Sequence, residues 1–324
     1  MKLAIIAAAV DDGTRTIFNA FSRELRADSE LLITASSRKM SLGDWMKLRS
    51  NVLEVTRTAD TVVCLNHGAL IVGALLLKRS RHKRIIGIGD WTRQFPSRRT
   101  DWRTLVYAHI LRRLLNRFDA VCSPVSSMRE FYADQIPMLP IKYPLPYPEI
   151  SPNTAQDSRG AKPNALFIGA DIKRKSGDVL LQLWNESPPA GATLTFVTPE
   201  TPPGNWENVK FHNDIKPFTE AHREVLAGNS VFILASQREA YGFAALEALN
   251  FGLIVVTTEA AGISELVHAA GGIVAPTPKE AIRQALELLN NSDELLGRQR
   301  LCRDYMSGYQ NNFRNLMDRA LGCH

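Results

Sequence analysis

Short apolar runs alternate with helix-type segments along this 324-residue chain, and no other feature constrains its fold as strongly. Each run has the length of one strand and few polar residues, which is typical of strands buried on both faces of a parallel sheet. Parallel neighbours need a crossover connection, and the helix-type segments supply it. The pattern therefore predicts an α/β protein with doubly wound sheets.

The runs fall into two groups on either side of a proline cluster at residues 137–153, which resists helix and predicts a stiff linker. A chain of this length accommodates two domains. We expect domains at 1–148 and 149–304 and a final helix at 305–324. The expected strands are 2–10, 31–36, 61–65, 84–88 and 120–124, then NALFIGA (164–170), ATLTFVT, NVKFH, SVFILAS and GLIVVTT.

Several features favour a cytoplasmic protein. The longest apolar run, Gly68–Leu77, has ten residues against the ~20 of a membrane-spanning helix, so it predicts a buried helix. The start, MKLAIIAAAV, predicts a buried first strand, because it is shorter than the roughly 15 residues of a secretory signal. The cysteines have no paired spacing, which predicts neither a metal site nor a disulfide framework: Cys64, Cys122, Cys302 and Cys323.

Positive charge gathers in the first half. Residues 1–150 hold 23 Lys+Arg against 14 Asp+Glu, a balance of +9, and the remainder has a balance of −3. Residues 101–118 predict an amphipathic helix that carries Arg103, Arg112, Arg113 and Arg117. This helix could contact an anionic membrane surface, or its arginines could simply be solvated. We do not expect nucleic acid as a partner, because no aromatic-rich basic groove accompanies the arginines.

The segment 230–267 places two glutamates around a glycine between a strand and a helix. VFILAS predicts the strand and FAALEALNFG the helix, which ends near Gly252, so Glu239 falls in the loop and Glu247 in the helix. Ligands bind at the carboxyl ends of the strands in open α/β sheets, and Gly242 allows backbone N–H groups to approach a polar ligand. Ionised carboxylates accept hydrogen bonds from hydroxyls. The segment therefore predicts a site for a sugar nucleotide.

The pattern E-x-x-G-x-x-x-x-E, with the following ALNFGLIVVTTEAAGISELV, resembles the signature of the retaining GT-B glycosyltransferases of family 4, or group 1. The resemblance covers the second half well and the first half in outline. It implies two Rossmann-like domains facing a central cleft, with the last helix crossing back to the first domain. It also implies that Glu239 lies near the transferred sugar, that Glu247 holds the ribose hydroxyls, and that Gly242 and Phe243 help to bind the donor.

The segment FIGADIKRKSGDVLL (167–181) resembles the diphosphate-binding loop of the same family. A strand ends at Gly169, and Arg174 and Lys175 follow in a basic loop, where they could neutralise the charge on a departing nucleoside diphosphate. The alternative is an ordinary solvated turn. Ala170 departs from the family, in which many members place an arginine directly after the glycine.

The first half carries the weaker matches. VDDGTRT corresponds to a glycine-rich loop of the family but has only Gly13, with Thr14 beside it as an acceptor-side candidate. Gly89 and Asp90 stand where many relatives have His-Asp, so Asp90 is a candidate to contact the sugar or to accept the proton of the acceptor hydroxyl, or else a helix cap. His67 follows a strand and is a further acceptor-side candidate, or a structural histidine.

The resemblance implies transfer of a sugar from a nucleoside diphosphate donor to an acceptor hydroxyl, with retention and without a metal or other cofactor. We expect a glycan or lipid-linked acceptor, as in polysaccharide or lipopolysaccharide synthesis, and a cytoplasmic protein that is peripheral on the inner face of the membrane. Three alternatives remain open: an epimerase or phosphorylase of the same fold, a nucleotide-sugar-binding protein without activity, and a transferase acting on nucleic acid.

Overall fold

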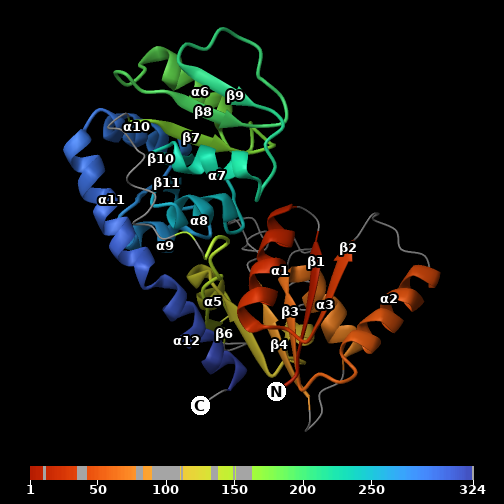
Figure 1. The fold of residues 1–324 in the computed structure, drawn as a ribbon. Coiled ribbons are helices and arrows are strands. Elements are labelled where there is room, and N and C mark those ends of the chain that lie inside the picture. Colours follow the sequence, from red (N-terminus) through yellow and green to blue (C-terminus); the bar gives the residue numbers. More distant parts are fainter. Residues whose placement is uncertain are drawn as a thin grey trace. The chain divides into compact units, whose positions relative to one another are not determined.

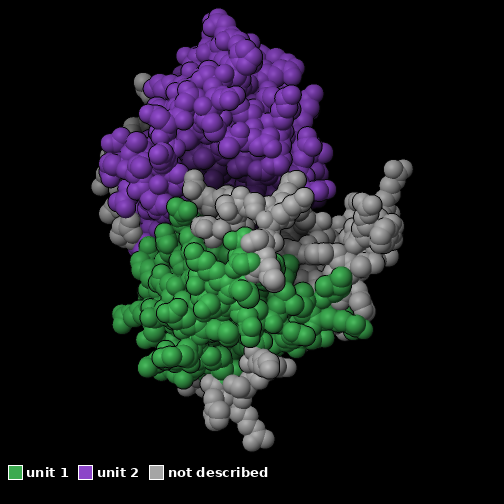
Figure 2. Space-filling model, turned by 90° about the vertical axis from the view of Figure 1, so that its right-hand side faces the viewer, with its two compact units in different colours: residues 1–144, 311–324 green, residues 145–310 purple. Residues whose placement is uncertain are grey.

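We analysed a computed structural model, which describes residues 1–9, 12–34, 42–77, 83–89, 110, 112–132, 138–148, 150 and 163–322. The chain divides into two compact units (Figure 2). Unit 1 comprises residues 1–144 and 311–324, and unit 2 comprises residues 145–310. The chain therefore passes between the units twice, first within the proline cluster and again at the start of the last helix.

Unit 1 is a parallel sheet of six strands in the order β2-β1-β3-β4-β5-β6 (Figure 1). Every residue of β3 is buried, and so are Leu3 to Ala7 of β1, so helices cover both faces at the centre of the sheet. The strands are β1 (Leu3–Ala9), β2 (Ser29–Thr34), β3 (Thr61–Leu65), β4 (Arg84–Ile88), β5 (Ala120–Ser123) and β6 (Met138–Pro140); the helices include α1 (Asp12–Leu25), α2 (Leu42–Val55), α3 (Asn66–Leu76), α5 (Ser126–Tyr132) and α12 (Tyr309–Leu321).

Unit 2 is a second parallel sheet of six strands, in the order β12-β11-β10-β7-β8-β9. All residues of β8, β10 and β11 are buried, as the apolar runs predict. The strands are β7 (Ala165–Ile168), β8 (Leu194–Val197), β9 (Val209–His212), β10 (Val231–Leu234), β11 (Ile254–Thr258) and β12 (Ile273–Ala275); the helices are α6 (Gly177–Glu186), α7 (Glu220–Ala227), α8 (Phe243–Asn250), α9 (Ser264–Ala269), α10 (Pro278–Leu289) and α11 (Ser292–Ser307). The predicted α/β fold class is confirmed in both units.

Each sheet has one point where the strand order reverses. In unit 1 the chain moves outward from β1 to β2 and then returns past β1 to β3. In unit 2 it moves outward from β7 through β9 and then returns past β7 to β10. Such switch points open a crevice at the carboxyl ends of the two diverging strands, where open α/β sheets bind ligands.

The last helix packs on the first sheet's helices within unit 1. Phe313 of α12 meets Phe21 of α1 edge-on at 5.6 Å between ring centroids. Arg314 pairs with Glu24 at 3.1 Å, and Arg84 donates to the Leu321 carbonyl at 2.7 Å. At the other end of the helix, the Leu145 N–H donates to Gln310 Oε1 at 3.2 Å, which ties together the two places where the chain changes units.

Three details of unit 1 refine the sequence predictions. The proline cluster is not wholly a linker, since its residues Met138–Pro140 pair with β5 as β6 at the edge of the sheet, where proline is tolerated. Gly68–Leu77 falls almost entirely in α3, as predicted. Most of the predicted basic helix 101–118 lies outside the described residues. Within it, Arg112, Arg113 and Arg117 are exposed, and Arg117 donates to the Ala74 carbonyl at 2.7 Å near the end of α3.

Candidate functional site

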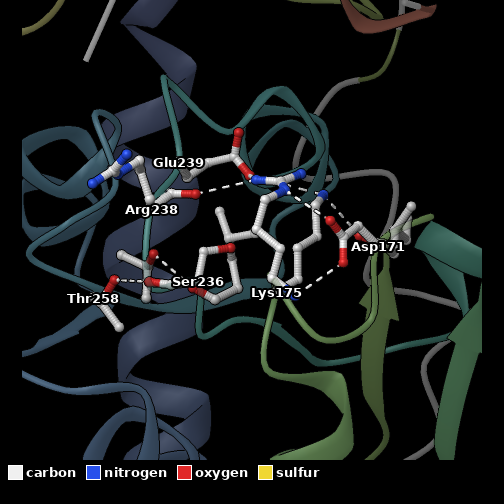
Figure 3. A network of polar contacts seen from close by, with 10 residues as sticks. Asp171, Lys175, Ser236, Arg238, Glu239 and Thr258 are labelled. Atoms are coloured by element: carbon white, nitrogen blue, oxygen red, sulfur yellow. Dashed lines mark hydrogen bonds and ion pairs between the residues drawn. The ribbon is translucent and has the colours of Figure 1, made fainter. Parts of the chain in front are cut away.

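The switch point of unit 2 brings a basic loop and an acidic loop together. The first follows β7 and the second follows β10, and β7 and β10 are paired neighbours. Arg174 and Lys175 come from the first loop and Glu239 from the second, and Figure 3 shows Lys175 and Glu239 within one polar network. Ser176 has a left-handed backbone conformation (φ 54°) and connects the first loop to the start of α6.

Arg174 is held between two carboxylates. Its Nη1 lies 3.4 Å from Glu239 Oε2 and 3.1 Å from the Arg238 carbonyl, and its Nε lies 3.5 Å from Asp171 Oδ2. The Arg174 side chain remains about half exposed. It is therefore oriented by the protein yet accessible to an anionic ligand, since an arginine presents more N–H donors than these contacts require.

Lys175 is better buried and lies near both glutamates. Its Nζ donates to the Ile168 carbonyl at 3.2 Å and lies 4.0 Å from Glu239 Oε2. The side chain runs across Gly169, where a Cβ would come within 2.5 Å of Lys175 Cδ. Gly169 therefore gives the lysine its path toward the carboxyl edge of the sheet.

Glu239 and Gly242 shape the second loop. Glu239 forms an isolated parallel bridge with Ala261, and its carbonyl accepts from the Gly262 N–H at 3.2 Å. Gly242 has φ 103° and a close contact with Leu234, so a side chain here would meet both backbone strain and a clash. Phe243 begins α8 and its ring lies 5.5 Å from that of Tyr241. The backbone N–H groups in the first turn of α8 therefore directly follow this loop.

Glu247 is a carboxyl group inside the protein. It lies in the second turn of α8 with 6% of its surface exposed. Burial raises its pKa to about 8, and the nearby Lys175 cation opposes that rise. A buried carboxyl group needs hydrogen-bond partners.

A buried polar chain that the sequence did not reveal leads to Glu247. His222 Nε2 of α7 lies 3.9 Å from Glu247 Oε2, and its Nδ1 lies 2.7 Å from the Tyr147 hydroxyl. Tyr147 also accepts from the Phe218 N–H at 3.2 Å. All of these residues belong to unit 2. Their distances along the sequence leave no motif, so only the fold brings them together.

Two further hydroxyls at the same edge of the sheet are buried. Ser176 precedes α6 and Ser236 follows β10, and neither Oγ has a hydrogen-bond partner among the described residues. The Ser236 carbonyl accepts from Thr258 Oγ1 at 2.6 Å, which fixes the backbone beside Glu239 (Figure 3). Buried polar atoms without a partner are uncommon and are often resolved by a ligand or water.

The predicted acceptor-side residues are less fully described. Gly13 and Thr14 fall in the first turn of α1, not in a loop, and His67 falls in the first turn of α3, but their side chains lie outside the described residues. Asp90 also lies outside them. Gly13, Thr14 and His67 thus follow β1 and β3, the two strands of the unit 1 switch point.

Neither a metal cluster nor a membrane span is found in the described part of the chain. No group of three or more His, Cys, Asp and Glu there could hold a metal ion, and none of its helices is both long and apolar enough to cross a bilayer. A cavity of about 600 Å³ lies between α9, β12, α10 and α11 and includes Gly271 and Arg298. Since it opens near the start of β12, it belongs to the amino edge of the sheet, away from the site.

Comparison with known proteins agrees with this geometry. Residues 162–291 match the family model "Glycosyl transferases group 1". Unit 2 contains a group 1 glycosyl transferase domain. The group 1 domain includes Gly169, Arg174, Lys175, Glu239, Gly242 and Glu247, whose individual roles stay predictions. No curated protein sequence gives a significant match to the chain.

Solved structures match the group 1 domain and unit 1 together. Anabaena Alr3699/HepE in complex with UDP and glucose has a TM-score of 0.70 at 14% identity, covering 99% of this chain and 98% of that one. WaaG, a glycosyltransferase involved in lipopolysaccharide biosynthesis, has 0.64 at 16%, covering 99% and 100%. Sucrose-phosphate synthase from Thermosynechococcus elongatus has 0.67 at 14%, covering 99% and 97%. The two Rossmann-like units therefore have the GT-B fold.

Proposed function

We propose that this protein transfers a sugar from a nucleoside diphosphate donor to an acceptor hydroxyl, with retention of the anomeric configuration. The observation that carries the proposal is the pairing of two cations, Arg174 and Lys175, with Glu239 at the switch point of the group 1 domain. Preorganised cations stabilise the charge that develops on a departing diphosphate. Glu239 would lie near the transferred sugar, and Glu247 would accept the ribose hydroxyls.

The leaving group would be stabilised by side chains alone, so we propose that no metal is required. Arg174 offers a planar set of N–H donors that suits phosphate oxygens, and Lys175 adds a second positive charge close by. Gly242 and the first turn of α8 would contribute backbone N–H groups. Activity that persists in EDTA supports this part of the proposal, and loss of activity that magnesium restores contradicts it.

A screen of nucleoside diphosphate sugars tests the function as a whole. A ligand that binds only the folded protein raises its melting temperature. UDP-sugars come first, because the similar HepE structure holds UDP and glucose, and GDP-, ADP- and TDP-sugars complete the panel. Stabilisation with slow release of the nucleoside diphosphate supports a transferase. Stabilisation without turnover on any acceptor indicates a non-catalytic binding protein, and no stabilisation by any donor contradicts the proposal.

We further propose a glycan or lipid-linked acceptor, used at the cytoplasmic face of the membrane. The exposed side of α2 supports this part. Trp45, Met46 and Leu53 are 38%, 64% and 43% exposed. Arg49 lies on the same side of the helix, because residues four apart are neighbours there. Large apolar side chains interspersed with arginine suit an anionic lipid surface.

Sedimentation with vesicles tests the membrane contact. We expect the wild type to bind phosphatidylglycerol vesicles more strongly than phosphatidylcholine vesicles and less strongly at high salt. The variant W45S/M46S/L53S should lose most of this binding. The variant L296S/L301S, which removes two exposed leucines of α11, should keep it. Equal sedimentation of both variants with the wild type would contradict a role for α2.

A further inference from the structure

One carboxylate, that of Asp171, contacts Arg174 at two points. Asp171 Oδ1 accepts a hydrogen bond from the Arg174 backbone N–H at 3.0 Å, and Asp171 Oδ2 lies 3.5 Å from Arg174 Nε. Both residues belong to the basic loop that follows β7. Figure 3 shows Asp171 in the same polar network as Lys175 and Glu239. Asp171 therefore holds both the backbone and the guanidinium of Arg174.

The backbone contact stabilises the shape of the loop. The Asp171 carbonyl accepts the Lys175 N–H at 3.1 Å, and the Ile172 carbonyl accepts the Gly177 N–H at 2.7 Å, so a single turn leads directly into α6. A side-chain oxygen that accepts the N–H three residues later is a common cap of such a turn. Capping needs only one acceptor oxygen, which asparagine or serine also supplies. The loop itself therefore does not require a carboxylate.

The second oxygen of Asp171 acts on the guanidinium. Arg174 Nη1 lies 3.1 Å from the Arg238 carbonyl oxygen and 3.4 Å from Glu239 Oε2, and Arg174 Nε faces Asp171. Arg174 Nη2 has no hydrogen bond or ion pair with a residue that the structure describes. Both N–H groups of Nη2 can therefore donate to a phosphate oxygen while the other two nitrogens are held.

The negative charge of Asp171 also repels an anionic ligand, so its two effects oppose each other. The Asp171 side chain is 57% exposed, and water and salt screen its charge most strongly at longer separations. Its contact with Arg174 is short, and the backbone hydrogen bond keeps the two residues together. We therefore expect orientation of the guanidinium to outweigh repulsion of the ligand.

We propose that Asp171 is a positioning residue that orients Arg174 toward the departing diphosphate of the sugar donor. Without Asp171 Oδ2 the guanidinium would be held at Nη1 alone and could rotate away before the bond between sugar and diphosphate breaks. A cation stabilises developing charge most effectively when it is already in place. This proposal rests on the proposed function.

The variant D171N separates the two contacts. Asparagine Oδ1 can still accept the Arg174 N–H, whereas its amide nitrogen cannot accept from Nε. We expect kcat to fall about 3- to 10-fold, because one charge-assisted contact is lost. The donor KM should stay within about 2-fold, since Arg174 acts mainly on charge that develops as the diphosphate leaves. D178N makes the same change of charge at an exposed position in the first turn of α6 and should keep the wild-type kcat.

A double-mutant cycle tests whether Asp171 acts through Arg174. R174A alone should lower kcat, and D171N should cause no further loss in the R174A background. A similar loss in both backgrounds, a D171N kcat equal to or above that of wild type, or an equal loss in D178N would overturn the proposal.

Melting temperatures show whether each variant is folded. Should D171N fold poorly, D171S takes its place in the cycle, because a serine hydroxyl can also accept the Arg174 N–H. A wild type that neither binds nor turns over any donor of the screen contradicts the proposed function, whereas a loss confined to these variants concerns Asp171 alone.

Discussion

Each unit has one switch point, and the described residues at the two switch points differ greatly. In unit 1, Asn66 follows β3 in the left-handed conformation (φ 65°), and its side chain pairs with both the N–H and the carbonyl of Ala8 in β1. In unit 2, Ser176 takes the left-handed position (φ 54°), and Arg174 and Lys175 precede it with their charges directed at Glu239. The described polar contacts of the first switch point satisfy the protein's own backbone.

This difference indicates which of the two similar sheets is expected to carry the chemistry. A neutral amide that bonds to two backbone groups holds two diverging strands together and leaves little bonding capacity for a ligand. Arg174 and Lys175 share one carboxylate, and the Arg174 side chain remains about half exposed, so a ligand can reach it. We therefore expect the anionic part of the proposed donor to bind unit 2.

The largest expected effect comes from removing both cations. R174A/K175A should lower kcat about 100- to 1000-fold, because preorganised groups that stabilise the leaving diphosphate act mainly in the transition state. R238A removes a neighbouring exposed arginine whose carbonyl, not its side chain, contacts Arg174, so it should stay near wild type. Steady-state kinetics with the donor from the screen measure both. Similar losses in the two variants would mean that net charge alone matters.

Removing the buried carboxyl group should have the next largest effect. E247A should weaken nucleoside diphosphate binding about 10- to 100-fold, since ribose hydroxyls lose their buried carboxyl partner. E224A, at an exposed position of α7, is the matched control and should bind normally. Calorimetric titration with UDP gives both affinities. Unchanged UDP affinity in E247A would mean that Glu247 does not bind the ribose.

Asn66 provides the converse test in unit 1. N66A should lower the free energy of unfolding by about 1–3 kcal/mol, because the Ala8 backbone groups lose their partner, while UDP affinity stays unchanged. Urea denaturation and calorimetry measure the two quantities. A marked loss of UDP affinity in a folded N66A protein would contradict a purely structural role for Asn66 at the unit 1 switch point.

The pH dependence of stability should be the smallest effect. The folded-state pKa of Glu247 is raised to about 8, so the folded protein binds more protons than the unfolded chain between pH 4.5 and 8. Stability from this group is full below that range and is lost as pH rises through 8. His222, with a lowered pKa of about 4, opposes this trend only below pH 6.5.

The free energy of unfolding of the wild type should therefore fall by about 1–2 kcal/mol between pH 6.5 and 8, because each pH unit below the raised pKa contributes about 1.4 kcal/mol. E247Q has no ionisable group at position 247, so its free energy of unfolding should fall less over the same interval. Urea midpoints at the two pH values provide the measurement. A steeper decline in E247Q than in wild type would contradict a raised pKa at Glu247.

The sequence predicted most of the sheets because buried parallel strands read as uninterrupted apolar runs. β3 and β4 match their predicted bounds, and β10 and β11 fall within theirs. β6 and β12 were not predicted, since each has three residues, and β6 lies among prolines that argue against a strand. Edge strands this short are defined by their neighbours more than by their own residues.

The candidate site was predictable only where its residues stand close together along the chain. Arg174 with Lys175, and Glu239 with Glu247, form local patterns that indicate a ligand. Their mutual contact required the pairing of β7 with β10. His222 and Tyr147 gave no signal, because a histidine in a helix and a tyrosine among prolines are common in any protein. Only the fold brings His222 Nε2 to 3.9 Å from Glu247 Oε2 and its Nδ1 to 2.7 Å from the Tyr147 hydroxyl.

Gly169 has a consequence for how this family of loops can change. The lysine side chain occupies the volume that any larger residue at position 169 would need, with only 2.5 Å from a built Cβ to Lys175 Cδ. The two positions are therefore not free to vary separately. A larger residue at position 169 would be tolerated only if residue 175 became shorter or adopted another rotamer. Replacing Gly169 would therefore also change where the positive charge of residue 175 can lie.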